Sequence, residues 1–280
     1  MRLDSHQHFW SYSEREYDWI DERMSRIRRD FAPPDLEPIL RRNGIDGSIA
    51  VQVRQTLEET EYLLRLASEH DFIRGVVGWV DLRSPGARRD LERFRTNPRF
   101  RGVRHVVQAE PDDRFLLRED FLRGVAFLGD LDLTYDILVY HRQLPAVVDF
   151  VARFPGHRLV LDHIGKPAIA KGEIEPWASS IRKLGAMENL FCKLSGLVTE
   201  ADWRGWKKSD FKLYLEIVLE SFGPGRLLFG SDWPVATLAA SYEQVLEIVE
   251  DFLYPLSPAE KDAVFGGNAA RFYGLEVLPS

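Results

Sequence analysis

Short apolar segments alternate with longer amphipathic segments along the chain. Residues 47–53, for example, are nearly all apolar, as expected for a parallel strand that is covered on both faces. The pattern predicts eight such strands, at residues 3–8, 47–53, 73–80, 102–107, 133–140, 158–163, 190–194 and 226–230.

Each predicted strand is followed by a segment with helical spacing. The clearest is 56–69, whose apolar residues fall on one stripe. The pair Ser84-Pro85 predicts an N-cap and a first helical residue, and Ser241 and Ser257 each open a capping box. Further helices are predicted at 34–44, 119–128, 145–154, 175–184, 209–220 and 268–273.

Eight strands, each followed by a helix within about 250 residues, are typical of a (β/α)8 TIM barrel, an α/β fold. The composition does not shift along the 280 residues, so a single domain over 1–280 is expected. The rival fold is a doubly wound open sheet, which usually carries a glycine-rich phosphate turn after its first strand. Here that position reads His6-Gln7-His8-Phe9-Trp10, which cannot cradle a pyrophosphate.

The charge and cysteine content exclude several classes of protein. A formal net charge of −7 disfavours nucleic acid or an anionic membrane as the main partner. No apolar stretch is long enough to span a bilayer. The single cysteine, Cys192, and the lack of a signal-peptide pattern predict a reducing, cytoplasmic location. The oligomeric state is left open.

In a barrel of this kind the active site lies at the carboxyl ends of the strands. His6 and His8 lie on one face of the first strand, because alternate side chains of a strand point the same way. His163 ends the sixth predicted strand, and Asp232 follows the eighth. These residues either bind one divalent metal or activate water without it, with Asp232 as general base and the imidazoles stabilising an oxyanion. The structural alternatives are a core histidine at 163 and a turn cap at 232.

Two cations end other strands. Arg104 and Lys193 are candidates for substrate binding, although a cation in such a place often only pairs with a carboxylate. Because alternate side chains of a strand point to opposite faces, only one of the neighbours Arg104 and His105 points into the barrel, and Arg104 is preferred. Asp136 and Asp162 are expected to orient an imidazole from behind rather than to contact substrate.

Two long loops, 9–33 and 195–208, are rich in aromatic residues. Loops of this length are uncommon in compact domains and are often functional. Trp10 and Trp203 in these loops, and Trp233 in the loop after the eighth predicted strand, are candidates for the wall of a substrate pocket, with ordinary packing inside the loops as the alternative.

Six segments carry distinctive motifs: DSHQHFW at 4–10, DHIGKP at 162–167, KLSGL at 193–197, TEADW at 199–203, FGSDWP at 229–234 and FGGNA at 265–269. Together they resemble the motifs of the amidohydrolase superfamily, in particular of its branch of sugar-acid lactonases. The resemblance implies a (β/α)8 fold and hydrolysis of a lactone ring. It also implies metal-binding or polarising roles for His6, His8 and His163, and activation of water by Asp232.

The chain departs from the wider superfamily at two strands. Arg104-His105 stands where other members carry a carboxylated lysine or glutamate that bridges two metals, and Asp136 and Tyr140 replace a histidine of the fifth strand. A two-metal site is therefore not expected. The remaining possibilities are one divalent ion, such as zinc, on His6, His8 and Asp232, or no metal at all.

The leading hypothesis is a lactonase that acts on a small-molecule, six-carbon sugar lactone, with L-fuconolactone favoured. The first alternative is a metal-dependent decarboxylase or hydrolase of an aromatic-derived carboxylic acid on the same barrel. The second is a sugar-binding barrel without catalysis. Release of acid, release of carbon dioxide and binding without turnover distinguish the three.

Overall fold

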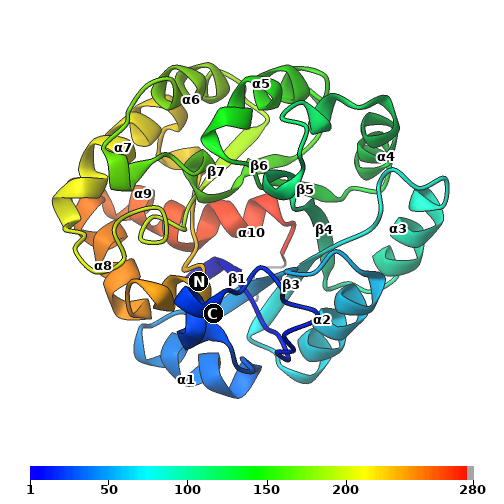
Figure 1. Ribbon diagram of the computed structural model, residues 1–280, viewed down its shortest axis with the longest axis horizontal. Coiled ribbons are helices and arrows are strands. Elements are labelled where there is room, and N and C mark those ends of the chain that lie inside the picture. Colours follow the sequence, from blue (N-terminus) through cyan, green and yellow to red (C-terminus); the bar gives the residue numbers. More distant parts are fainter. Residues whose placement is uncertain (276–280) are drawn as a thin grey trace.

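The computed structural model describes residues 1–275, so the last five residues of the predicted domain 1–280 lie outside the described part. It confirms the (β/α)8 barrel: eight strands form one sheet in chain order, with helices around it (Figure 1). The strands are β1 (Leu3–Gln7), β2 (Gly47–Val51), β3 (Ile73–Gly78), β4 (Phe100–His105), β5 (Thr134–Ile137), β6 (Leu159–Leu161), β7 (Leu190–Leu194) and β8 (Leu227–Phe229).

Every neighbouring pair from β1–β2 to β7–β8 is parallel. The remaining gap, between β8 and β1, is closed by the segment that follows β8. The backbone N–H of Asp232 donates to His6 O at 2.8 Å, and that of His8 donates to Trp233 O at 2.7 Å. The first strand and the distant Gly-Ser-Asp segment therefore lie side by side.

The helices cover the outside of the sheet, except α10, which crosses one end of the barrel (Figure 1). Arg158, just before β6, donates to Phe272 O at 2.7 Å, so α10 lies at the amino ends of the strands. The α-helices of the described residues are α1 (Pro33–Arg42), α2 (Leu57–Glu69), α3 (Ala87–Arg95), α4 (Glu119–Asp130), α5 (Leu144–Ala152), α6 (Trp177–Gly185), α7 (Lys208–Phe222), α8 (Tyr242–Phe252), α9 (Pro258–Asp262) and α10 (Asn268–Phe272).

Two predicted helix starts are wrong. The Ser84 hydroxyl accepts from the Gly86 N–H in a turn, and α3 begins only at Ala87. Ser209 does not cap α7, because the Asp210 carboxylate accepts the Lys207 N–H at 2.8 Å and the helix starts one residue before Ser209. In contrast, the capping boxes at Ser241 and Ser257 are confirmed.

The strands also end earlier than predicted at several places. The clearest is β6, predicted to reach residue 163, which ends at Leu161 because the chain enters a tight turn at 162–165. The long loop after β1 contains a 3₁₀ helix, Glu22–Ile27, that packs against the 3₁₀ helix Val235–Leu238 after β8. Within residues 1–275, no helix combines the length and the apolar character needed to cross a bilayer.

Candidate active site

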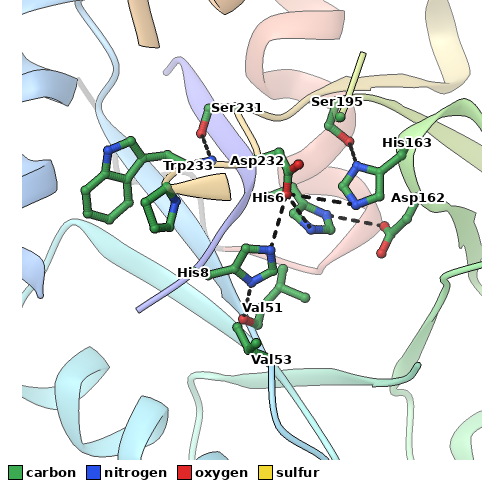
Figure 2. A network of polar contacts seen from close by, with 12 residues as sticks. His6, His8, Val51, Val53, Asp162, His163, Ser195, Ser231, Asp232 and Trp233 are labelled. Atoms are coloured by element: carbon green, nitrogen blue, oxygen red, sulfur yellow. Dashed lines mark hydrogen bonds and ion pairs between the residues drawn. The ribbon is translucent and has the colours of Figure 1, made fainter. Parts of the chain in front are cut away.

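Three imidazoles and one carboxylate converge at the carboxyl ends of β1, β6 and β8 (Figure 2). Asp232 Oδ1 lies 3.4 Å from His8 Nε2, 3.9 Å from His6 Nε2 and 4.0 Å from His163 Nε2. All four side chains are buried. The structure therefore brings together the four residues predicted to carry the chemistry, although their roles in a reaction stay predictions.

Asp4 links the two segments that supply His6 and Asp232. Its Oδ1 accepts from the backbone N–H of His6 at 3.1 Å and from that of Ser231 at 2.9 Å, and the Tyr242 hydroxyl donates to Oδ2 at 3.2 Å. Burial raises the pKa of Asp4 to about 6, although these donors oppose the shift. Sequence reasoning gave Asp4 no role, since a carboxylate at the start of a strand has no distinctive pattern.

The His8 ring is fixed in one tautomer. Its Nδ1 lies 2.7 Å from Val51 O, and a carbonyl oxygen only accepts, so Nδ1 carries the proton. Burial lowers the pKa of His8, which favours the neutral ring. The Nε2 lone pair then faces the Asp232 carboxylate. Both atoms are hydrogen-bond acceptors, and neither carries a proton that could bridge them.

This arrangement fits a divalent cation. A tetrahedral ion with ligand bonds of about 2.0–2.2 Å needs ligand atoms about 3.3–3.6 Å apart, close to the 3.4–3.9 Å that separates Asp232 Oδ1 from the Nε2 atoms of His8 and His6. Imidazole and carboxylate are ligands that zinc accepts. His6, His8 and Asp232 therefore form a suitable donor set for one ion.

His163 and Asp232 are both held in the left-handed region of the backbone. The φ angles are 54° at His163, 48° at Ile164, 47° at Lys166 and 58° at Asp232. Left-handed conformations cost about 1–2 kcal/mol for each non-glycine residue, and such strain concentrates at functional sites. At 163 the surroundings enforce it, since the His163 Nδ1 lies 2.9 Å from Ser195 Oγ and the Trp177 indole donates to Ile164 O at 2.8 Å.

A buried charge network lies beneath His6. Lys193 Nζ is 2.5 Å from Asp136 Oδ2 and 2.9 Å from Asp162 Oδ1, and Arg104 Nη1 is 3.2 Å from Asp162 Oδ2. Burial would raise the pKa of Asp162, but Lys193, His6 and Arg104 together outweigh burial and hold the pKa well below its usual value. The network holds two basic and two acidic side chains, so paired charges compensate one another inside the barrel.

The same two cations flank the His6 ring. Lys193 Nζ lies 3.1 Å from Nδ1, and Arg104 Nη1 lies 3.2 Å from Nε2. Burial lowers the pKa of His6 well below its usual value, and a neutral imidazole can accept at only one nitrogen. Only one of these cations can therefore donate a full hydrogen bond to the ring at a time.

Arg104 and Lys193, the predicted substrate-binding cations, are thus paired with buried carboxylates below the imidazoles. Their side chains are 4% and 0% exposed, which favours an effect on substrate through His6 and Asp162 rather than by contact. Of the neighbours Arg104 and His105, it is His105 that points out of the barrel, as preferred from the sequence, and its ring stacks on Phe115 at 4.8 Å.

The three candidate tryptophans belong to the loop packing. Trp10 and Trp233 are buried, with the Phe31 ring 5.3 Å and 5.2 Å from their rings, respectively. Trp203 is half-buried and its indole donates to Thr199 O at 2.9 Å. A contact between these rings and substrate stays a prediction.

Asp232 is suited to accept a proton. Burial alone would raise its pKa, but the His163 and His8 rings outweigh this effect and the Lys166 charge adds to theirs, so the pKa lies below its usual value. Burial lowers the pKa of His163 well below its usual value. Near neutral pH the site therefore combines an ionised carboxylate with neutral imidazoles.

Two curated relatives are similar to this chain over nearly its whole length. An L-fucono-1,5-lactonase of Burkholderia multivorans is 47% identical, over 98% of this chain and 96% of the relative. An L-fucono-1,5-lactonase of Burkholderia ambifaria is 40% identical, over 99% of this chain and 96% of the relative.

A crystal structure of a Burkholderia multivorans amidohydrolase with bound Zn is similar to the present fold, with a TM-score of 0.94 and 47% sequence identity. The match covers 99% of this chain and 100% of that one. The family model described as amidohydrolase matches residues 3–275. This chain belongs to the amidohydrolase family.

Proposed function

We propose that this protein hydrolyses the lactone of a six-carbon sugar acid, with L-fucono-1,5-lactone as substrate, and releases the open-chain acid. Two relatives at 47% and 40% identity, both L-fucono-1,5-lactonases, support the reaction and the substrate. The structural observation that best supports hydrolysis is that the Asp232 carboxylate lies within 4.0 Å of three neutral imidazoles.

In this mechanism Asp232 accepts a proton from a water molecule as the water oxygen attacks the lactone carbonyl carbon. His6, His8 and His163 lie around the oxyanion that develops on the carbonyl oxygen. The Nε2 of neutral His8 has no proton to donate, so the part proposed for His8 is to hold a divalent ion beside the oxyanion. The bond between the carbonyl carbon and the ring oxygen then breaks, and the ring oxygen takes up the proton that Asp232 received. One water is consumed, and the product is a hydroxy acid.

A divalent ion would be held by His6, His8 and Asp232, the donor set described above. When bound, such an ion polarises a carbonyl and lowers the pKa of a coordinated water. The protein's own contribution is to orient the ligands: Val51 O fixes the His8 tautomer, and Asp162 lies 3.4 Å from the His6 Nδ1.

The decarboxylase alternative is less well supported by the charges of the site. An aromatic di- or tricarboxylic acid needs cations that its carboxylates can reach. Arg104 and Lys193 are instead buried and neutralised by Asp162 and Asp136. This pairing favours an uncharged substrate such as a lactone.

A pH-indicator assay of acid release tests the proposal. The panel contains L-fucono-1,5-lactone, lactones of stereoisomeric sugar acids and an aromatic dicarboxylic lactone, each with added zinc and with chelator. We expect the fastest acid release from L-fucono-1,5-lactone. No turnover of any sugar lactone under either condition, or faster turnover of the aromatic acid, would contradict the proposal.

A further inference from the structure

The turn after β6 places Lys166 on the same side as His163. Residues 163–166 form a left-handed turn with 3₁₀ hydrogen bonding, in which the Lys166 N–H donates to His163 O at 2.9 Å. With three residues per turn, side chains at positions i and i+3 lie one above the other. A backbone that is strained at three non-glycine residues therefore directs the Lys166 side chain toward the side of the catalytic imidazole.

Lys166 meets residues from the two neighbouring loops. Its Nζ lies 3.3 Å from Glu200 Oε1, in the loop after β7, and 5.2 Å from the centre of the Tyr140 ring, just after β5. The Glu200 backbone is fixed in turn, because its carbonyl accepts from the Ala170 N–H at 2.9 Å. Three successive loops of the carboxyl-end rim thus form one cluster, Tyr140–Lys166–Glu200.

The exposure of this cluster sets it apart from the charges below His6. The Lys166 and Glu200 side chains are 15% and 19% exposed, whereas Arg104 is 4% and Lys193 0% exposed. An ammonium has three N–H donors, and Glu200 engages only one of them.

We propose that Lys166 and Glu200 bind adjacent ring hydroxyls of the lactone, with the Tyr140 ring against the apolar C–H face of the sugar. This inference rests on the proposed function. A hydroxyl both donates and accepts, so an ammonium that only donates and a carboxylate that only accepts, 3.3 Å apart, match a pair of neighbouring hydroxyls. The cluster would then select polyhydroxylated lactones, while Asp232 and the histidines act on the carbonyl.

The test combines one substitution with a series of substrates. The kcat/KM of the wild type and of Lys166→Met is measured on L-fucono-1,5-lactone and on analogues that lack one ring hydroxyl each. Lys166→Met should lower kcat/KM on the full lactone by about 10–100-fold, the value of a hydrogen bond to a charged group. For the analogue that lacks the bound hydroxyl, wild type and variant should agree within about twofold.

Lys171→Met is the matched control, since Lys171 is an exposed lysine of the same loop, and it should match the wild type on every lactone. Glu200→Gln is the second variant, and its loss should vanish on the analogue that lacks the adjacent hydroxyl. Equal losses on all analogues, or no loss on the full lactone, would overturn the subsite. A wild type that turns over none of these lactones would instead overturn the proposed function.

Discussion

His8 and Asp232 face each other through two atoms that both accept hydrogen bonds. The contact between His8 Nδ1 and Val51 O decides this, because it leaves only a lone pair on Nε2, 3.4 Å from the carboxylate. A backbone carbonyl cannot be removed by substitution of its side chain, so this control over the ring is built into β2. The pair attracts whatever cation lies between its members, which is the physical basis of the predicted metal affinity.

Zinc binding should depend on this pair. We expect chelator-treated wild type to bind about one zinc per chain in a calorimetric titration. His8→Asn should weaken zinc binding by at least about tenfold, because loss of a residue that merely hydrogen-bonds a metal ligand already weakens metal binding by about that factor. His70→Asn, a substitution at the end of α2, is the control and should leave the titration unchanged. Equal zinc affinity in wild type and His8→Asn would remove His8 from the donor set.

The buried carboxylate of Glu59, which lies outside the candidate active site, should make the free energy of unfolding depend on pH. Glu59 accepts from the backbone N–H groups of Val53 and Arg54, yet burial raises its pKa from 4.5 to about 7. Between these values the folded chain holds a proton that the unfolded chain releases. The free energy of unfolding should therefore fall as pH rises from about 5 to 7, by up to about 3 kcal/mol from this group.

Chemical denaturation at several pH values checks this expectation. Glu59→Gln cannot ionise, so its stability should decline less than that of the wild type over this range. Glu58→Gln, which changes an exposed neighbour, should follow the wild type. Parallel curves for wild type and Glu59→Gln would show that Glu59 is already ionised at the lower pH.

At the scale of elements, the turn after β6 is held in place by the loop after β7. A Cβ added to Gly196 would lie 2.5 Å from His163 Nδ1 and 2.7 Å from its Cγ, so no side chain fits there without moving the imidazole. Gly196 also has a φ of +63°, which disfavours other residues independently of space.

Two glycines separate these effects. Gly196→Ala and Gly172→Ala impose similar backbone strain, since φ is +63° and +66°, but a Cβ at 172 meets nothing within 4 Å. Both should lower the free energy of unfolding by about 1 kcal/mol or more. Only Gly196→Ala should also lower kcat, by about tenfold or more, because it displaces the His163 ring, which we propose stabilises the oxyanion. Equal kcat values for Gly196→Ala and Gly172→Ala would show that the position of the His163 ring does not limit catalysis.

The strands and their order could be predicted from the sequence because each buried strand is an apolar run and the helices between them repeat apolar residues at helical spacing. Strand alternation also placed His6 with His8, and it required Arg104 and His105 to point to opposite faces without deciding which of them points inward. The turn at 163–166 could not be predicted, because nothing in the residue types of His163 or Ile164 favours a positive φ; tertiary contacts impose it. The pairing of Lys193 with Asp136 and Asp162 depends on three different strands and has no local pattern.

At the scale of the whole molecule, closure of the barrel creates the site. Residues 6 and 232, separated by most of the chain, are joined by the backbone hydrogen bond from the Asp232 N–H to His6 O at 2.8 Å. At the opposite end, Tyr273 after α10 donates to Asp136 Oδ2 at 2.8 Å and so braces the charge network below His6. The ring of strands thus supports the imidazoles from beneath, and substrate preference is left to the loops at the carboxyl-end rim.

The most direct test of the account is the rate of acid release from L-fucono-1,5-lactone by Asp232→Asn. Asparagine keeps the shape of the side chain but cannot take a proton from water, so kcat should fall by at least about 100-fold while the melting temperature stays close to that of the wild type. Asp202→Asn, on the exposed part of the loop after β7, should retain full activity. A folded Asp232→Asn protein with near-native turnover would contradict the account.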